Sequence, residues 1–190
     1  MEGVKIGYAL CGSFCTIKKS IAQMKLFKDA GAVLYPIMSE IVYSSDTRFG
    51  TAESNRKLVE EICGNKIIHD IAGAEPIGPQ QMLDILIIAP CTGNTLGKLA
   101  CGITDTSVTM AAKAHLRNER PLLIAPSTND ALSSSAKNIA ALLVAKNIFF
   151  VPFSQDAPEI KTRSCVSDFS KVYDSAVAAL KGYQIQPILM

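Results

Sequence analysis

Two short apolar runs of this chain end in nearly the same phrase. The first closes as Ile88-Ala89-Pro90-Cys91-Thr92 and the second as Ile124-Ala125-Pro126-Ser127-Thr128. A continuous apolar run is typical of a strand buried in a parallel sheet, and proline, which lacks a ladder donor, is expected to end the pairing. Small polar residues follow each phrase. Because ligands of open α/β sheets bind at the carboxyl ends of strands, the repeat predicts a ligand site formed by both loops.

Strand and helix patterns alternate along the rest of the chain. Apolar runs predict strands at 4–10, 32–38, 84–89, 122–125 and 148–153. Apolar residues three or four apart predict helices at about 17–27, 53–62, 95–100, 106–116, 136–145 and 169–180. We expect loops at 40–50 and 74–79, and a tail at 184–190 that lies on the body or on a neighbouring protomer. The alternation predicts one α/β domain over 1–190, a three-layer Rossmann-like (flavodoxin-like) parallel sheet with helices on both faces.

Composition narrows the possible partners and location. The net charge of the 190 residues is only +2, and the basic residues are scattered, which disfavours nucleic acid and membrane surfaces as partners. No apolar run approaches the roughly 20 residues of a membrane-spanning helix. The N-terminus enters a strand pattern without the apolar segment of a signal peptide, so we expect a cytoplasmic protein.

The six cysteines are expected to be free thiols. None forms a C-x-x-C pair, and the two histidines are not spaced as in a zinc finger, so the sequence predicts no metal site. A disulfide framework is uncommon in a chain of this size without a secretory signal. Cys91, beside a predicted helix start, is either a small packed residue or a thiol with a lowered pKa.

Polar residues at three predicted strand ends are the candidate site. Gly12-Ser13 suits a phosphate at a helix N-terminus, or is an ordinary turn with an N-cap serine. Ser39 ends the next strand and would face the same crevice. The hydroxyl and amide groups of the 90–95 block suit a ligand with phosphate or carbonyl oxygens, or start a well-capped helix. Asp105 either lies near that ligand or caps the helix at 106, as Thr104 could.

These segments occur in the order seen in homo-oligomeric flavin-containing cysteine decarboxylases. That superfamily carries a P-A-S-A-N-T-like block, a G-x-x-D and a P-x-M-N-like block; this chain has P-C-T-G-N-T at 90–95, G-I-T-D at 102–105 and P-S-T-N at 126–129. The resemblance implies bound FMN and a homo-oligomer, a trimer or a dodecamer. It places Gly12, Ser13 and Ser39 at the phosphate and ribityl end, Thr92, Gly93, Asn94 and Thr95 along the isoalloxazine, and Asp105 and Asn129 close by.

Within the superfamily, further segments resemble the B subunits of dipicolinate synthases. They lie at 47–50, 75–79, 117–121, 127–132, 146–150 and 186–189. The resemblance implies an oxidoreductase subunit that acts in sporulation with the dipicolinate synthase A subunit, which binds NAD(P), and converts a dihydrodipicolinate-type precursor to dipicolinic acid. Arg48 is the candidate for binding the small dicarboxylate substrate, because a guanidinium holds a carboxylate with two hydrogen bonds; alternatively it is a solvated loop residue.

Two departures from the superfamily leave the catalytic residue unassigned. Cysteine decarboxylases carry a histidine eight residues before the aspartate of the central strand, and counting back from Asp84 gives Pro76. His69, further upstream, is interpreted as a surface or helix-end residue. Prenyl-transferring members have an arginine where this chain has Met110. The sequence therefore leaves two alternatives to an oxidoreductase role. One is a non-catalytic binding subunit with a flavoprotein fold, and the other, less favoured, is a flavin-dependent decarboxylase.

Overall fold

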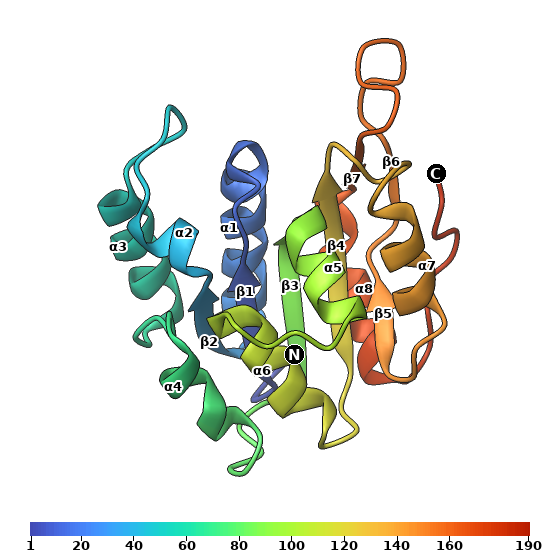
Figure 1. Ribbon diagram of the computed structural model, residues 1–190. Coiled ribbons are helices and arrows are strands. Elements are labelled where there is room, and N and C mark those ends of the chain that lie inside the picture. Colours follow the sequence, from blue (N-terminus) through green and yellow to red (C-terminus); the bar gives the residue numbers. More distant parts are fainter.

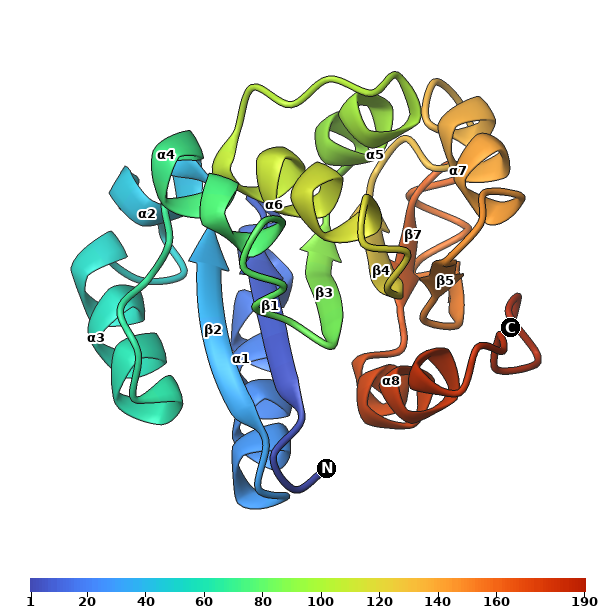
Figure 2. The ribbon, with the colours of Figure 1, turned by 90° about the horizontal axis from the view of Figure 1, so that it is seen from below.

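The computed structural model describes residues 1–190 as a central sheet with helices on both faces (Figures 1 and 2). The seven strands are β1 (Lys5–Leu10), β2 (Val33–Met38), β3 (Ile85–Cys91), β4 (Leu122–Thr128), β5 (Ile148–Phe150), β6 (Phe153–Gln155) and β7 (Cys165–Ser167). The α-helices are α1 (Phe14–Asp29), α2 (Glu40–Ser44), α3 (Ala52–Cys63), α4 (Ile71–Ala74), α5 (Gly93–Ala100), α6 (Ser107–Leu116), α7 (Ala136–Leu143) and α8 (Val172–Leu180). Two 3₁₀ turns, η1 (Glu75–Ile77) and η2 (Phe169–Lys171), complete the elements.

The parallel part of the sheet has the predicted doubly wound order. Strands β2, β1, β3, β4 and β5 run parallel in that spatial order, which is the flavodoxin-like arrangement. The α/β fold class predicted from the sequence is confirmed. The polar loops that follow β1, β3 and β4 therefore meet at one edge of the sheet.

An antiparallel addition at one edge differs from the all-parallel expectation. The predicted strand at 148–153 divides into β5 and β6, and Pro152, which has no ladder donor, lies between them. β5 pairs with the first half of β4, whereas β7 pairs antiparallel with its last two residues, Ser127 and Thr128. β6 then pairs antiparallel with β7. The segment between β6 and β7 consequently projects beyond the carboxyl edge of the sheet (Figure 1).

The two prolines do not end their strands, contrary to the prediction. β3 continues to Cys91 and β4 to Thr128, with a register shift between Ile88 and Cys91. Neither proline leaves its strand unsupported, because its carbonyl is used by a neighbour. The Pro90 carbonyl accepts from the Cys11 amide at 3.2 Å, and the Pro126 carbonyl accepts from the Ser167 hydroxyl at 3.0 Å.

Each face of the sheet has its own apolar core. On one face, α1, α3 and α8 bury Phe27, Val59 and Ala176 against alternate residues of β1, β2 and β3. On the other, α5, α6, α7 and η1 cover the intervening residues, among them Leu86 and Ile124. Figure 2 shows these two helical layers on opposite sides of the strands. None of the helices is both long and apolar enough to cross a membrane.

Two segments expected to be loops contain helical turns. Residues 40–44 form α2, whose N-cap position is Ser39. Residues 71–77 form α4 and η1; the Asp70 carboxylate accepts from the Gly73 amide at 2.7 Å and caps α4. Pro76 fits the first turn of η1, where its missing N–H needs no acceptor. The prolines and glycines that predicted a loop are therefore compatible with short helical turns.

The C-terminal tail lies on the body, one of the two predicted placements. The side-chain amide of Gln184 accepts from the Phe150 amide and donates to its carbonyl, both at 2.7 Å. The exposed backbone edge of β5 is thereby satisfied.

We expect Gln184→Ala to lower the free energy of unfolding by about 1–2 kcal/mol, because both polar backbone groups of Phe150 lose their partner. Urea denaturation followed by circular dichroism measures this change. Gln186→Ala is the matched control, since Gln186 lies two residues away, is exposed and makes no side-chain hydrogen bond. Equal stability of the two variants would contradict the prediction.

Candidate functional site

A cavity of about 720 Å³ opens at the carboxyl edge of the sheet. It lies among the loops after β1, β3 and β4, and its volume is within the range of small-molecule sites. The structure brings seven of the ten predicted site residues to its wall: Gly12, Ser13, Arg48, Thr92, Gly93, Asn94 and Asn129. The other three, Ser39, Thr95 and Asp105, do not line it.

The Gly12-Ser13 turn is joined to the end of β4. Ser13 occupies the N-cap position of α1, as predicted, but its hydroxyl makes no capping bond and lies 2.8 Å from the Ser127 hydroxyl. A Cβ on Gly12 would lie 3.1 Å from the Ile41 side chain, so the turn packs closely against α2. The first amides of α1 have no acceptor within the helix and are available to an anion at this edge.

Gly93 lies against a network of hydroxyl groups around Asp130. The Asp130 carboxylate accepts from the hydroxyls of Thr128, Ser134 and Ser135. These bonds, with that of Ser134 contributing most, hold the pKa of Asp130 below its usual range. A Cβ on Gly93 would lie 2.5 Å from an Asp130 carboxylate oxygen, so the first turn of α5 packs closely on this network only because residue 93 is glycine.

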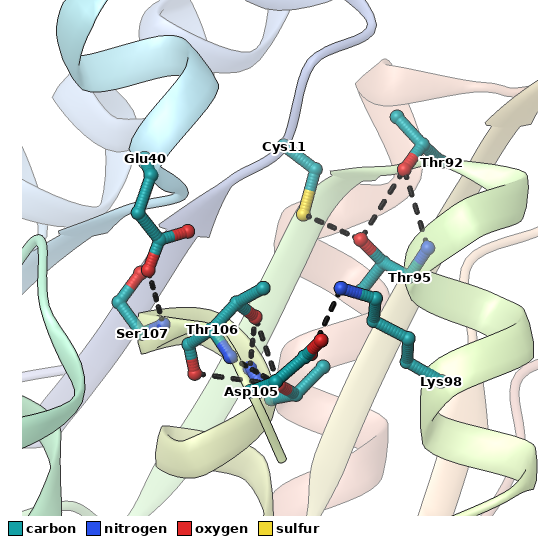
Figure 3. Close-up of polar contacts among 9 residues, drawn as sticks. Cys11, Glu40, Thr92, Thr95, Lys98, Asp105, Thr106 and Ser107 are labelled. Carbon is teal, nitrogen blue, oxygen red and sulfur yellow. Dashed lines mark hydrogen bonds and ion pairs between the residues drawn. The ribbon is translucent and has the colours of Figure 1, made fainter. Parts of the chain in front are cut away.

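Thr95 stands behind the cavity wall. The Thr92 hydroxyl accepts from the Thr95 amide at 3.4 Å and caps α5. The Thr95 hydroxyl donates to the Cys11 thiol at 3.3 Å and lies 3.2 Å from that of Thr92, as Figure 3 shows. Thr92 is therefore both a cap and a wall residue, whereas the buried Thr95 links α5 to the end of β1.

Asp105 does not cap α6. Its carboxylate pairs with Lys98 of α5 at 2.8 Å, as Figure 3 shows. Thr106 is the N-cap and forms a reciprocal capping box with Thr109. The structure thus corrects both suggested caps, Asp105 and Thr104, because the helix begins at Ser107.

Ser39 is a buried hydroxyl without a partner. It occupies the N-cap position of α2 but makes no side-chain cap, and its Oγ has no hydrogen-bond partner. Its amide donates to the Leu10 carbonyl at 3.0 Å, which fixes it beside the end of β1. Buried hydroxyls are almost always hydrogen-bonded, so this position has an unused donor next to the Gly12-Ser13 turn.

Arg48 is presented to the cavity by a short turn. Thr47 and Gly50 exchange two backbone hydrogen bonds of 3.0 and 3.1 Å around Arg48 and Phe49. The Arg48 guanidinium carbon lies 4.9 Å from the centre of the Phe49 ring. Gly50 has a φ of 146°, which a residue with a side chain rarely adopts. The distinctive order at 47–50 therefore builds a hairpin that carries a cation.

Cys91 is a packed residue and not an activated thiol. It is fully buried, and burial raises its pKa well above the usual value. Burial likewise raises the pKa of the neighbouring Cys11 to about 11. Both thiols are therefore protonated at neutral pH, which rules out the lowered pKa that the helix N-terminus suggested.

Several wall residues were not predicted from the sequence. Asp156, Lys161, Ser164 and Val166 come from β7 and from the segment between β6 and β7. No motif marks this segment, and only the pairing of β7 with the end of β4 brings it to the cavity. Ser127 and Thr128 also line the cavity, and they belong to the second proline phrase, whose loop the sequence placed at the ligand site.

Comparison with known proteins assigns the family. The sequence profile of the Flavoprotein family matches residues 1–181. The chain belongs to the Flavoprotein family. It is 42% identical to the B subunit of dipicolinate synthase from Bacillus subtilis (strain 168) over 190 residues, which cover 100% of this chain and 95% of the relative. Within the flavoproteins it therefore belongs to the family of dipicolinate synthase B subunits.

Solved structures of flavoproteins share the fold. The crystal structure of the dipicolinate synthase B subunit from Bacillus halodurans C has a TM-score of 0.92 at 39% identity and covers 100% of this chain and 97% of that one. A dodecameric FMN-dependent UbiX-like decarboxylase from Escherichia coli O157:H7 has a TM-score of 0.63 at 21% identity, covering 78% of this chain and 80% of that one. The second likeness shows the fold alone.

No histidine of this flavoprotein lines the cavity. His69 stacks on Tyr43 with ring centroids 3.8 Å apart, and the buried His115 bonds to the Pro121 carbonyl at 2.9 Å, before the start of β4. Pro76, at the counted position of the decarboxylase histidine, is also absent from the wall. The cavity therefore offers no imidazole for proton transfer from a cysteine-derived substrate.

Proposed function

We propose that this flavoprotein is the B subunit of a dipicolinate synthase and binds FMN in the strand-edge cavity. Acting with a nicotinamide-binding A subunit, it would convert a dihydrodipicolinate-type precursor to dipicolinate. The observation that carries the proposal is the convergence of both proline loops and the Gly12-Ser13 turn on one cavity. The full-length likeness to a dipicolinate synthase B subunit supports the substrate class.

The donor groups at the cavity suit a flavin mononucleotide. Gly12, Ser13 and the first amides of α1 would hold the phosphate, and the unpartnered Ser39 hydroxyl beside them would gain an acceptor. Thr92, Gly93, Asn94 and Asn129 would lie along the ring system. Bound FMN would supply a hydride acceptor for the aromatising oxidation, in which the precursor loses a hydride and a proton.

The chain's own residues would bind and orient the substrate. Arg48, held over the cavity by its turn, would hold a substrate carboxylate with two hydrogen bonds. Thr95 and Asp105 lie outside the wall, and we propose that they act by keeping α5 and α6 in place. The absence of histidine at the wall supports oxidation over cysteine decarboxylation.

We expect Asn94→Ala to weaken FMN binding about 3- to 10-fold, the value of one net hydrogen bond. Asn94 is exposed at the cavity and makes no side-chain hydrogen bond within the chain, so stability should not change. Quenching of flavin fluorescence during titration measures the affinity. Asn138→Ala on α7 is the control. Loss of affinity in both variants, or in neither, would oppose this assignment.

The function itself is tested by mixing the purified chain with its nicotinamide-binding partner protein. We expect a flavin absorption band in the isolated chain and dipicolinate formation only when both proteins are present. Full activity of the partner alone would overturn the proposal. If activity requires this chain but persists after flavin is removed, a non-catalytic binding role replaces the redox role.

A further inference from the structure

The cavity wall carries two cations, and they stand on separate loops. Arg48 lies in the segment between α2 and α3, and Lys161 lies between β6 and β7. In Figure 1 these two segments rise from the carboxyl edge on either side of the start of α1. Every other residue of the wall is neutral or acidic.

Lys161 is fixed by an ion pair and by backbone hydrogen bonds, and its ammonium group keeps free hydrogen-bond donors. Its ammonium group pairs with the Asp156 carboxylate at 2.9 Å. Its amide donates to the Ala157 carbonyl at 2.7 Å and its carbonyl accepts from the Ser164 amide at 3.0 Å. An ammonium group has three donors, and Asp156 is the sole partner of this one. Two donors therefore remain for a ligand while the pair to Asp156 is kept.

The two acidic residues of the wall equal these cations in number, but they leave donors of both cations free. The Asp130 carboxylate is occupied by three hydroxyl groups, and that of Asp156 by Lys161. An exposed ion pair such as that of Lys161 and Asp156 contributes little energy of its own, so sharing Lys161 with a second carboxylate costs little. Arg48 has no ion-pair partner and stacks only on Phe49.

We propose that Lys161 is a specificity-determining residue that holds the substrate carboxylate remote from Arg48. The inference rests on the proposed function, which places a pyridine dicarboxylate in this cavity. Arg48 and Lys161 would each take one carboxylate, and the site would thereby select a dicarboxylate over a monocarboxylate with the same ring.

The test is a calorimetric titration of the full chain, with and without added FMN, in metal-free buffer. The probes are pyridine-2,6-dicarboxylate and pyridine-2-carboxylate. We expect the wild type to bind the dicarboxylate about tenfold more tightly, the value of one charge-assisted contact. Lys161→Gln should abolish this preference and change affinity for the monocarboxylate less than about twofold. Arg48→Gln should weaken both ligands.

Lys146→Gln is the matched control, since Lys146 also pairs with a carboxylate at 3.1 Å but lies outside the cavity. An unchanged preference in Lys161→Gln, an equal loss for both ligands, or no binding of the dicarboxylate to the wild type would overturn the inference. Binding of FMN is measured separately by flavin fluorescence, so a chain that does not bind FMN is recognised independently of the carboxylate titrations. A chain that binds no FMN but shows the Lys161-dependent preference would retain the inference and lose the redox role.

Discussion

Gly93→Ala is expected to lower both the stability of the chain and its affinity for FMN. The added Cβ would lie 2.5 Å from an Asp130 carboxylate oxygen and 2.7 Å from the hydroxyls of Thr128 and Ser135. Because these atoms are bonded to one another, they cannot all withdraw without breaking the network. We expect a loss of about 1–3 kcal/mol in the free energy of unfolding, the usual cost of overpacking, and at least about a tenfold loss of flavin affinity.

Gly97→Ala on the same helix is the matched control. A Cβ there would lie no closer than 3.3 Å to any neighbour, and that neighbour is the end of the Asn138 side chain. Replacing glycine inside a helix by alanine favours the helix by about 0.5–1 kcal/mol. Urea denaturation and flavin titration of both variants provide the comparison, and a Gly93→Ala protein as stable as Gly97→Ala would show that the network yields without cost.

Acidification is expected to destabilise the protein through His115. Burial, the largest cause, lowers the pKa of His115 from 6.5 to about 4, and its ring nitrogen donates to the Pro121 carbonyl at 2.9 Å. As the pH falls from 6.5 towards 4, His115 is protonated in the unfolded chain but stays neutral in the folded chain. The stabilisation linked to neutral His115 is thus fully present above pH 6.5. It decreases as the pH falls, and near pH 4 the free energy of unfolding is lower by about 3 kcal/mol.

Urea denaturation at a series of pH values measures this loss. The carboxylates also contribute below pH 5, so the informative quantity is the difference between the wild type and His115→Gln, whose amide can still donate to Pro121. We expect the pH slope between about 6.5 and 4 to be clearly smaller in this variant. His69→Gln, which changes the only other histidine, should keep the wild-type slope, and identical slopes in all three proteins would exclude His115 as the cause.

Six of the seven predicted site residues at the cavity, all except Arg48, meet there for a reason that was visible in the order of residues. The loops after β1, β3 and β4 lie at one edge because those strands are parallel. Ser39, Thr95 and Asp105 have suitable chemistry but lie outside the wall. Their positions depend on the tilt of short helices and on where each helix begins, which local propensity does not determine.

The errors in the fold prediction also have physical causes. Prolines were expected to end β3 and β4, but a proline stays in a strand when its missing donor is not required and its carbonyl finds a partner, as Pro126 does with Ser167. The strands β5, β6 and β7 have three residues each. The apolar run at 148–153 predicted β5 and the start of β6, whereas the three residues of β7 carry no periodic signal and pair with the edges that β4 and β6 offer.

Sequence alone determined the doubly wound sheet, its two apolar faces and the edge at which a ligand would bind, because continuous apolar runs alternating with amphipathic helices have few other ways to bury their surface. Tertiary structure decided which charges face that ligand. Arg48 and Lys161 lie on loops distant in sequence, and the second reaches the cavity only through the pairing of β7 with β4. Burial, which no local pattern encodes, also decided that Cys91 is a protonated packing residue and that His115 is uncharged.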